Sequence, residues 1–94
     1  MNASAGADAI VRRRKRLKYR SWHRGTKEMD LLLGPFADAC LDGFEAPQLA
    51  EYEALLEHPE PDLYEWIMGR AVPPPSARSS VLDRLIAYYA ADAR

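Results

Sequence analysis

Apolar residues recur at intervals of three and four along most of the chain, which is the spacing of one face of an α-helix. The strongest pattern follows Thr26, a suitable N-cap, and Gly43 is expected to end the helix. Its apolar positions are Met29, Leu32, Leu33, Phe36, Cys40, Leu41 and Phe44. This spacing predicts a central helix that is kinked or restarted at Pro35, because proline cannot donate the backbone hydrogen bond of a helix interior.

Four further helices are predicted on either side of this one. Residues 11–23 form the first, and Gly25 follows as a left-handed cap. Pro47 and Pro61 stand where proline commonly opens a helix. The prolines 73–75 predict an extended connector, and the last helix follows it with a serine N-cap and the apolar positions Val81, Leu82, Leu85, Ile86 and Tyr89. Because no segment alternates as a strand does, the fold class is all-α, a small bundle of five short helices.

The length of 94 residues is enough for one small domain. Residues 1–10 are small and polar and are predicted to form a disordered tail, whereas residues 11–94 are predicted to form a single helical domain. A chain of this size has a modest core. An enclosed active site would take up much of that core, which weighs against an enzyme.

Charge divides the chain into a basic start and an acidic remainder, although the net charge is only −1. Residues 1–27 carry nine Arg and Lys against one acid, and residues 28–94 carry four against thirteen. The basic segment could therefore meet an anionic partner or neutralise the acidic part of its own chain. Binding to nucleic acid is an alternative, but residues 12–16 would surround a helix rather than line one side, and the acidic remainder would repel DNA.

Few residues could carry catalytic or metal chemistry. Cys40 is the only cysteine, so it cannot form an internal disulfide, and with only His23 and His58 it cannot complete a zinc site. Its place on the apolar face of the central helix favours packing as a small hydrophobe. No apolar run approaches the roughly 18 residues that span a membrane, and the start lacks a signal-peptide core. These features predict a cytoplasmic protein that is not an enzyme and holds no metal.

The stretch RGTKEMD, residues 24–30, joins the basic and acidic parts and is called the RGTKEMD segment below. Arg24 would lie at the end of one helix and Glu28 at the start of the next. Their charges could form an ordinary salt bridge, or they could be presented to a partner, and their spacing leaves both interpretations open. Trp66 likewise could be a core residue, which its spacing from Leu63 favours, or an interface anchor.

Three motifs occur in order along the chain: R-G-x-x-E at residues 24–28 followed by Met-Asp, then L-L-G-P-F, then P-D-L-Y-E-W-I-M-G. In this order they resemble the SdhE family, the succinate dehydrogenase assembly factors that assist covalent flavin attachment. The similarity extends over roughly residues 12–90. It implies a five-helix bundle, in agreement with the helical pattern.

The resemblance also implies a function and a site. The partner would be the flavoprotein subunit of succinate dehydrogenase, with fumarate reductase as a further candidate, and the chain would be monomeric when free. It would hold no cofactor stably and would act on FAD held by the partner, without nucleic acid or membrane. The family's motif falls on Arg24, Gly25 and Glu28. Further family-typical positions that could contact the partner are Asp30, Asp62 and Trp66. An antitoxin-like interaction protein or a small nucleic-acid-binding protein is the alternative.

Overall fold

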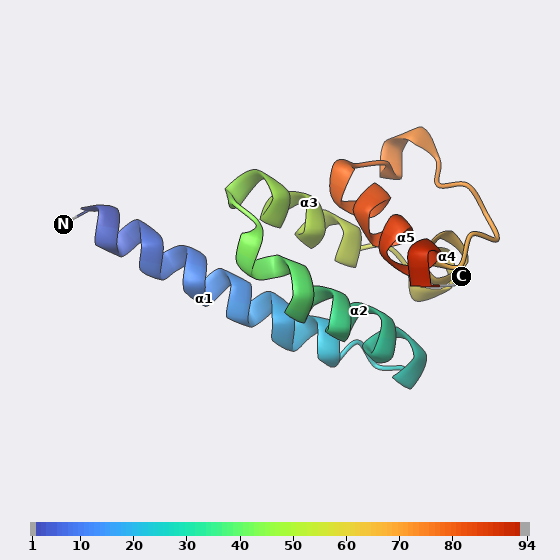
Figure 1. The fold of residues 1–94 in the computed structure, drawn as a ribbon, viewed down its shortest axis with the longest axis horizontal. Helices are drawn as coiled ribbons and strands as arrows, with labels where there is room; N and C mark the ends of the chain where they lie inside the picture. Colours follow the sequence, from blue (N-terminus) through green and yellow to red (C-terminus); the bar gives the residue numbers. More distant parts are fainter. Residues whose placement is uncertain (1, 93–94) are drawn as a thin grey trace. The chain divides into compact units, whose positions relative to one another are not determined.

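A computed structural model describes the backbone of residues 2–92 and the side chains of residues 6–90. These residues form five α-helices, two short 3₁₀ turns and no strand (Figure 1). In chain order the elements are α1 (Asn2–Trp22), α2 (Lys27–Cys40), η1 (Leu41–Gly43), α3 (Ala46–Leu56), α4 (Glu60–Ile67), η2 (Pro75–Ala77) and α5 (Ser80–Asp92). The all-α prediction with five short helices is confirmed.

The start of the chain differs from the predicted tail. Helix α1 begins at Asn2, so residues 2–10 are helical rather than disordered, while residue 1 lies outside the described part. Alanine occupies four of the first nine positions, and it is the residue that most favours a helix. Once residues 11–22 are helical, adding such residues to the existing helix avoids the cost of a new nucleus.

By its contacts the chain divides into two compact units, Met1–Leu49 and Ala50–Arg94, and each is described here by itself. The single domain over residues 11–94 stays a prediction.

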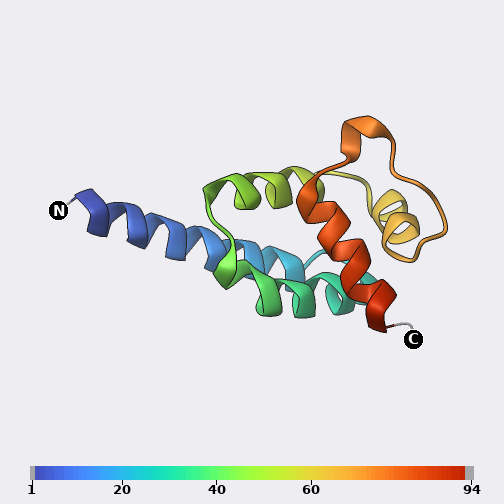
Figure 2. The same cartoon turned by 45° about the horizontal axis from the view of Figure 1, so that its top comes forward.

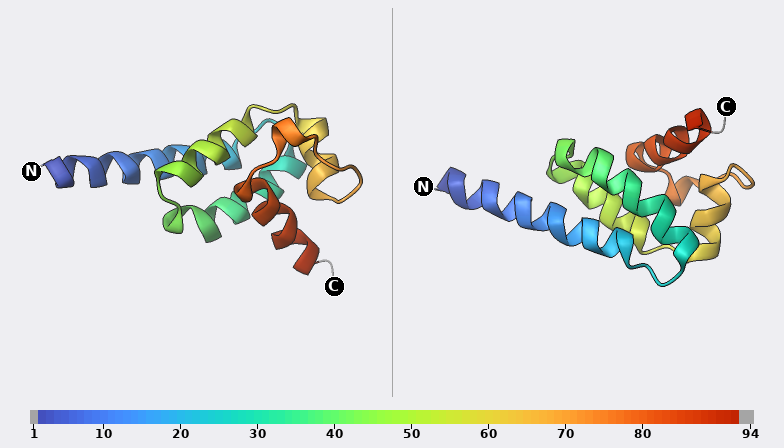
Figure 3. Two further views of the ribbon diagram at one scale, coloured as in Figure 1. Left: turned by 90° about the horizontal axis from the view of Figure 1, so that it is seen from above. Right: turned by 60° about the horizontal axis from the view of Figure 1, so that its bottom comes forward.

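In the first unit, α2 runs back beside α1, and the N-terminal half of α1 projects past the end of α2 (Figures 2 and 3). The buried side chains of this unit are Leu17, Ser21, Met29, Leu33, Phe36, Ala37, Leu41, Phe44 and Leu49. Phe36 and Phe44 meet edge to face with ring centroids 6.3 Å apart. The predicted apolar face of the central helix thus forms the core, although Leu32 and Cys40 are only partly buried.

The predicted restart of the central helix at Pro35 does not occur, because α2 continues through this residue. A proline at this position leaves the carbonyl of residue 31 without its usual donor. Leu31 is 54% exposed, so water can reach this part of the helix and compensate. As predicted, the helical stretch stops at Gly43, which is the last residue of the 3₁₀ turn η1.

The second unit contains most of α3 together with α4 and α5. Its buried side chains are Tyr52, Leu55, Leu56, Leu63, Trp66, Ile67, Val81, Leu82 and Leu85. Gly69 ends α4 with a positive φ of 73°. The proline connector is extended at Pro74, but Pro75–Ala77 turn into a 3₁₀ helix, which corrects the prediction of a fully extended segment. The first position of such a turn suits proline, whose φ is already near −65° and whose missing N–H is not needed there.

The start of α5 is capped from two places. Ser79 Oγ accepts a hydrogen bond from the Leu82 backbone N–H (3.1 Å), which is the predicted serine cap. Glu51, on α3, accepts from Ser80 Oγ (2.7 Å) and from the Val81 backbone N–H (3.0 Å) through the same carboxylate oxygen. These bonds to the ionised form, above all the one from Ser80, lower the pKa of the Glu51 carboxyl below its usual value.

Candidate functional site

The RGTKEMD segment forms the connection between α1 and α2 and the first turn of α2. Thr26 caps α2 as predicted, since its side chain accepts from the Met29 backbone N–H (3.4 Å) and its carbonyl from Asp30 N–H (3.0 Å). Glu28 and Asp30 lie in the first turn, where the helix dipole favours acids. Gly25 has a φ of 121°, a conformation that side-chain-bearing residues rarely adopt.

Asp30 is partly buried and fixes the connection from within the segment. One of its carboxylate oxygens accepts a hydrogen bond of 2.6 Å from the Arg24 backbone N–H. Hydrogen bonds to a charged acceptor are stronger than neutral ones. The role that the structure gives Asp30 is therefore to hold the chain at Arg24.

Arg24 and Glu28, the two charges of the predicted motif, are placed differently. Arg24 is partly buried, whereas Glu28 is exposed and makes no hydrogen bond or ion pair with any described residue. The salt bridge between them that the sequence left open is therefore not formed. The Glu28 carboxylate is instead free to meet a group outside the chain.

A stacked ring pair lies directly before Arg24. The rings of Tyr19 and His23 are 4.0 Å apart and nearly parallel, and His23 Nδ1 is 2.8 Å from the Tyr19 carbonyl oxygen, to which it donates when protonated. Both residues are exposed, Tyr19 to 66%. This pair was not predicted from the sequence, although the four-residue spacing between the two rings on a helix could have indicated it.

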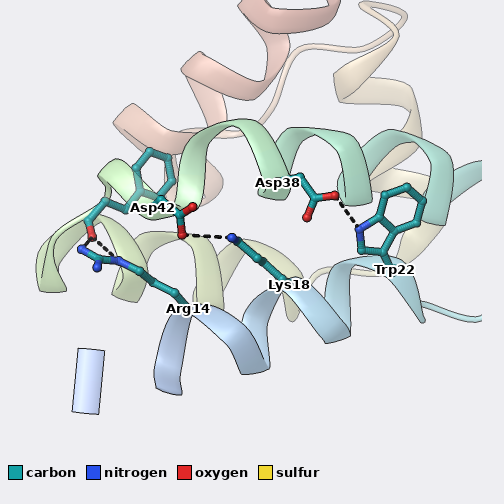
Figure 4. A network of polar contacts seen from close by, with 6 residues as sticks. Arg14, Lys18, Trp22, Asp38 and Asp42 are labelled. Atoms are coloured by element: carbon teal, nitrogen blue, oxygen red, sulfur yellow. Dashed lines mark hydrogen bonds and ion pairs between the residues drawn. The ribbon is translucent and has the colours of Figure 1, made fainter. Parts of the chain in front are cut away.

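The structure sorts the basic residues of α1 into two sets. Arg14 donates to the Phe44 carbonyl from Nε (3.2 Å) and from one terminal nitrogen (2.7 Å), and this terminal nitrogen lies 3.6 Å from Glu45. Lys18 pairs with Asp42 at 2.9 Å. Figure 4 shows these contacts in a row with a third, from Trp22 to Asp38. Two basic residues thus meet acids in their own unit, as one of the two charge interpretations expected.

The second set of basic residues faces away from α2. Arg12, Lys15 and Arg16 are exposed, and none has a hydrogen bond or ion pair with a described residue. Their spacing places them on one side of α1. Basic residues therefore lie on both the packed and the solvent-facing sides of α1, as expected from a basic stretch that surrounds the helix.

Asp62 and Trp66 belong to α4, in the second unit. Asp62 is exposed in the first turn of α4. Trp66 is only 7% exposed, and its ring meets that of His58 edge to face at 5.2 Å. The core interpretation of Trp66 is thus confirmed.

Cys40 and metal-binding clusters were the candidates for chemistry that the sequence raised. Cys40 is partly buried and reduced. Among the side chains of residues 6–90, no three acidic, histidine or cysteine groups are placed so that they could hold a metal ion. None of the helices in residues 2–92 has the length and apolar character needed to cross a membrane.

Comparisons with known proteins bear on the whole stretch from α1 to α5. A family model described as "Flavinator of succinate dehydrogenase" matches residues 15–89. The FAD assembly factor SdhE of Acetobacter pasteurianus is 40% identical over 79 residues, which cover 84% of this chain and 72% of that protein. The FAD assembly factor SdhE of Photobacterium profundum is 32% identical over 75 residues, or 80% of this chain and 84% of the relative.

A mitochondrial relative is also similar. The succinate dehydrogenase assembly factor 2 of Dictyostelium discoideum is 41% identical over 73 residues, which cover 78% of this chain and 52% of the relative. The chain thus spans about half the length of that protein. No solved structure matches the chain.

Proposed function

Because the chain belongs to the family of succinate dehydrogenase flavinators, we propose that it is an assembly factor that binds the flavoprotein subunit of succinate dehydrogenase and promotes covalent attachment of FAD to it. The observation that carries the proposal is the family match over residues 15–89, which contains the entire RGTKEMD segment. The exposed and unpaired Glu28 carboxylate on that segment supports it.

The proposed mechanism is binding rather than catalysis by the chain itself. Covalent flavin attachment requires the acceptor side chain and the flavin to be well placed, which the flavoprotein can largely achieve with its own residues. A helper that binds the competent conformation more tightly shifts the flavoprotein toward it, and a preference of about 1.4 kcal/mol changes the ratio about tenfold. Such a helper needs a docking surface but no catalytic group.

Within this proposal, Arg24, Gly25 and Glu28 form the centre of the docking surface. Glu28 meets the flavoprotein directly, Arg24 contributes its guanidinium, and Gly25 allows the close turn between them. Asp62 is exposed and is proposed as an additional contact. Trp66 contributes through the packing of its own unit, because its side chain is buried there.

The remaining expectations are part of the same proposal. The chain binds no cofactor stably, and FAD held by the partner is the substrate of the assembly step. It is monomeric when free, and fumarate reductase is a second candidate client. A chain with one cysteine, which cannot form an internal disulfide, suits the reducing cytoplasm.

The test uses a strain that lacks this protein. Covalent flavin on the flavoprotein subunit is measured by in-gel fluorescence after complementation with wild type, Arg24→Ala or the control Arg78→Ala, at matched expression. Arg78 is an exposed arginine of the second unit without a described partner. We expect wild type and Arg78→Ala to restore flavinylation and Arg24→Ala to restore little. Full flavinylation in the uncomplemented strain would refute the proposed function.

A nucleic-acid-binding or antitoxin-like role gains no support from the comparisons. The basic residues at the start of the chain also argue less for nucleic-acid binding, because Arg14 and Lys18 already contact Phe44 and Asp42 of the chain itself.

A further inference from the structure

The six-membered ring of the Trp22 indole occupies the space in which a side chain at position 34 would begin. A Cβ built on Gly34 would lie 2.3 to 2.6 Å from three atoms of this ring, Cδ2, Cε2 and Cε3. Gly34 is buried in the interior of α2 and has no unusual backbone conformation. Glycine disfavours a helix interior, so its presence here is explained by the space that it leaves for the indole.

A hydrogen bond orients the indole in this seat. Trp22 Nε1–H donates to Asp38 Oδ2 over 3.2 Å, and Asp38 lies one helical turn beyond Gly34 on α2 (Figure 4). Ring packing and hydrogen bond together fix both the position and the direction of the side chain. Trp22 is thereby attached to two successive turns of α2.

The place of Trp22 in the chain gives this attachment its importance. Trp22 is the last residue of α1, and only residues 23–26 separate it from α2. At the other end of this connection, Thr26 caps α2. Between Trp22 and Thr26, the Arg24 N–H donates a hydrogen bond to the Asp30 carboxylate. Since Trp22 fixes where the connection begins, it also determines how Arg24 and Gly25 are held relative to Glu28.

We propose that Trp22, seated on Gly34 and bonded to Asp38, is a positioning residue for the RGTKEMD segment; its effect on flavoprotein binding rests on the proposed function. The pair acts by complementary size, since the indole fits only while residue 34 has no side chain. The pair holds the docking residues in the arrangement that the partner recognises, which lowers the ordering cost of binding.

The first test follows the segment itself and needs no partner. Gly34→Ala should displace the indole and release the start of the connection, so that the Arg24 amide, bonded to Asp30, exchanges its hydrogen roughly tenfold faster. Exchange of the Leu85 amide in α5 should be unchanged, which separates release of the segment from global destabilisation. Gly43→Ala is the matched control, because an added Cβ there meets nothing within 4 Å. An unchanged Arg24 exchange rate in Gly34→Ala would overturn the proposal.

The second test measures affinity for the purified flavoprotein subunit in a double-mutant cycle. We expect Gly34→Ala and Trp22→Ala each to weaken binding about tenfold, and the double variant to bind no more weakly than Trp22→Ala, because the clash requires the indole. If the losses of binding free energy add in the double variant, the two residues act separately, and the proposal that they act as a pair is overturned.

The variant Trp22→Phe keeps an aromatic ring over Gly34 but lacks the indole N–H. If Gly34→Ala does not fold, hydrogen exchange is measured on Trp22→Phe and Trp22→Ala instead. The Arg24 amide of Trp22→Phe should exchange more slowly than that of Trp22→Ala. Equal rates would count against a role for the ring packed over Gly34. If wild type itself does not bind the flavoprotein, the proposed function fails, while the exchange experiment still decides the role of Trp22.

Discussion

Glu28 and Asp30 carry the same charge in the same turn of α2, yet their surroundings differ. The Asp30 carboxylate is partly buried and accepts a hydrogen bond from the backbone at Arg24. The Glu28 carboxylate faces solvent without a described partner. An acid that already has a partner contributes mainly to the fold, whereas an unpaired one is available for binding. At the scale of single residues, burial and hydrogen bonding therefore distinguish the acid that holds the fold from the acid that is accessible to a partner.

Replacing Glu28 by alanine should leave the fold nearly intact and impair function. The free energy of unfolding should fall by no more than about 1 kcal/mol, because only the interaction of an exposed charge with the helix dipole is lost. Covalent flavin on the partner subunit should fall sharply in the complemented strain. Asp83→Ala is the control, since Asp83 is also an exposed acid in the first turn of a helix. Full rescue by Glu28→Ala would remove this residue from the docking surface.

Gly25→Ala should destabilise the protein through its backbone alone. The φ of 121° at Gly25 is disfavoured for alanine, and left-handed conformations cost such residues about 1–2 kcal/mol. Urea unfolding of Gly25→Ala should therefore show a loss of this size. In Gly43→Ala, where φ is not positive, stability should be unchanged or raised by up to about 1 kcal/mol. Equal stability of Gly25→Ala and wild type would indicate that the turn can adopt another conformation.

At the scale of elements, polar groups link α1 to α2 and to the residues that follow it, beside the apolar packing. Arg14, Lys18 and Trp22 are spaced by four residues and lie on one side of α1. Asp38 accepts a hydrogen bond from Trp22, and Asp42, four residues further on, accepts one from Lys18. The Phe44 carbonyl accepts from Arg14. The contacts lie in a row because the two helices run side by side in opposite directions (Figure 4).

Arg14→Ala should cost about 1–3 kcal/mol of unfolding free energy, because it leaves the Phe44 carbonyl without its charged donor. Arg16→Ala, two positions further on, removes the same charge from the exposed side of α1 and should change stability by less than about 0.5 kcal/mol. Thermal unfolding of the two variants at equal salt provides the comparison. Equal effects would mean that the charge of α1, rather than this contact, matters for stability.

The start of α5 should make stability sensitive to acid through Glu51. Hydrogen bonds from Ser80 and from the Val81 backbone lower the pKa of this carboxyl in the folded state. The ionised carboxylate therefore stabilises the folded protein fully at a pH above the pKa of the unfolded chain, which is near the usual 4.5. This contribution is lost as the pH falls through the folded pKa, below 4.5. Urea midpoints at pH 7 and pH 3.5 should therefore differ less for Glu51→Gln than for wild type. An unchanged difference would show that other acids cause the loss.

At the scale of the whole molecule, the helices could be predicted because their signals are local. Thr26, Pro47, Gly69 and the serine before α5 act on their immediate neighbours, and the periodicity of apolar residues reports directly on burial. The motif residues Arg24, Gly25 and Glu28 came from a family resemblance, and their exposure could not be predicted from spacing. The seat of Trp22 on Gly34 was missed because it joins two helices. The neighbouring Pro35 instead suggested a kink or a restart of the helix at this point.

The division of charge along the chain does not make the protein a general ligand for polyanions. Part of the basic set is paired within its own unit, and residues 28–94 carry a large excess of acids. Titration with random duplex DNA at about 150 mM salt should therefore show no affinity tighter than the non-specific range of about 10–100 μM. Sequence-selective binding in the nanomolar range would favour the nucleic-acid alternative.

The indole that fills the place of a side chain at position 34 also constrains how this protein can change during evolution. Residues 22 and 34 share one volume, so neither can grow unless the other shrinks. A lineage that acquires a larger residue at 34 should already carry a smaller one at 22, because the reverse order passes through a clashing intermediate. Loss of the tryptophan is thus the permissive step, and it also leaves the Asp38 carboxylate without its indole donor.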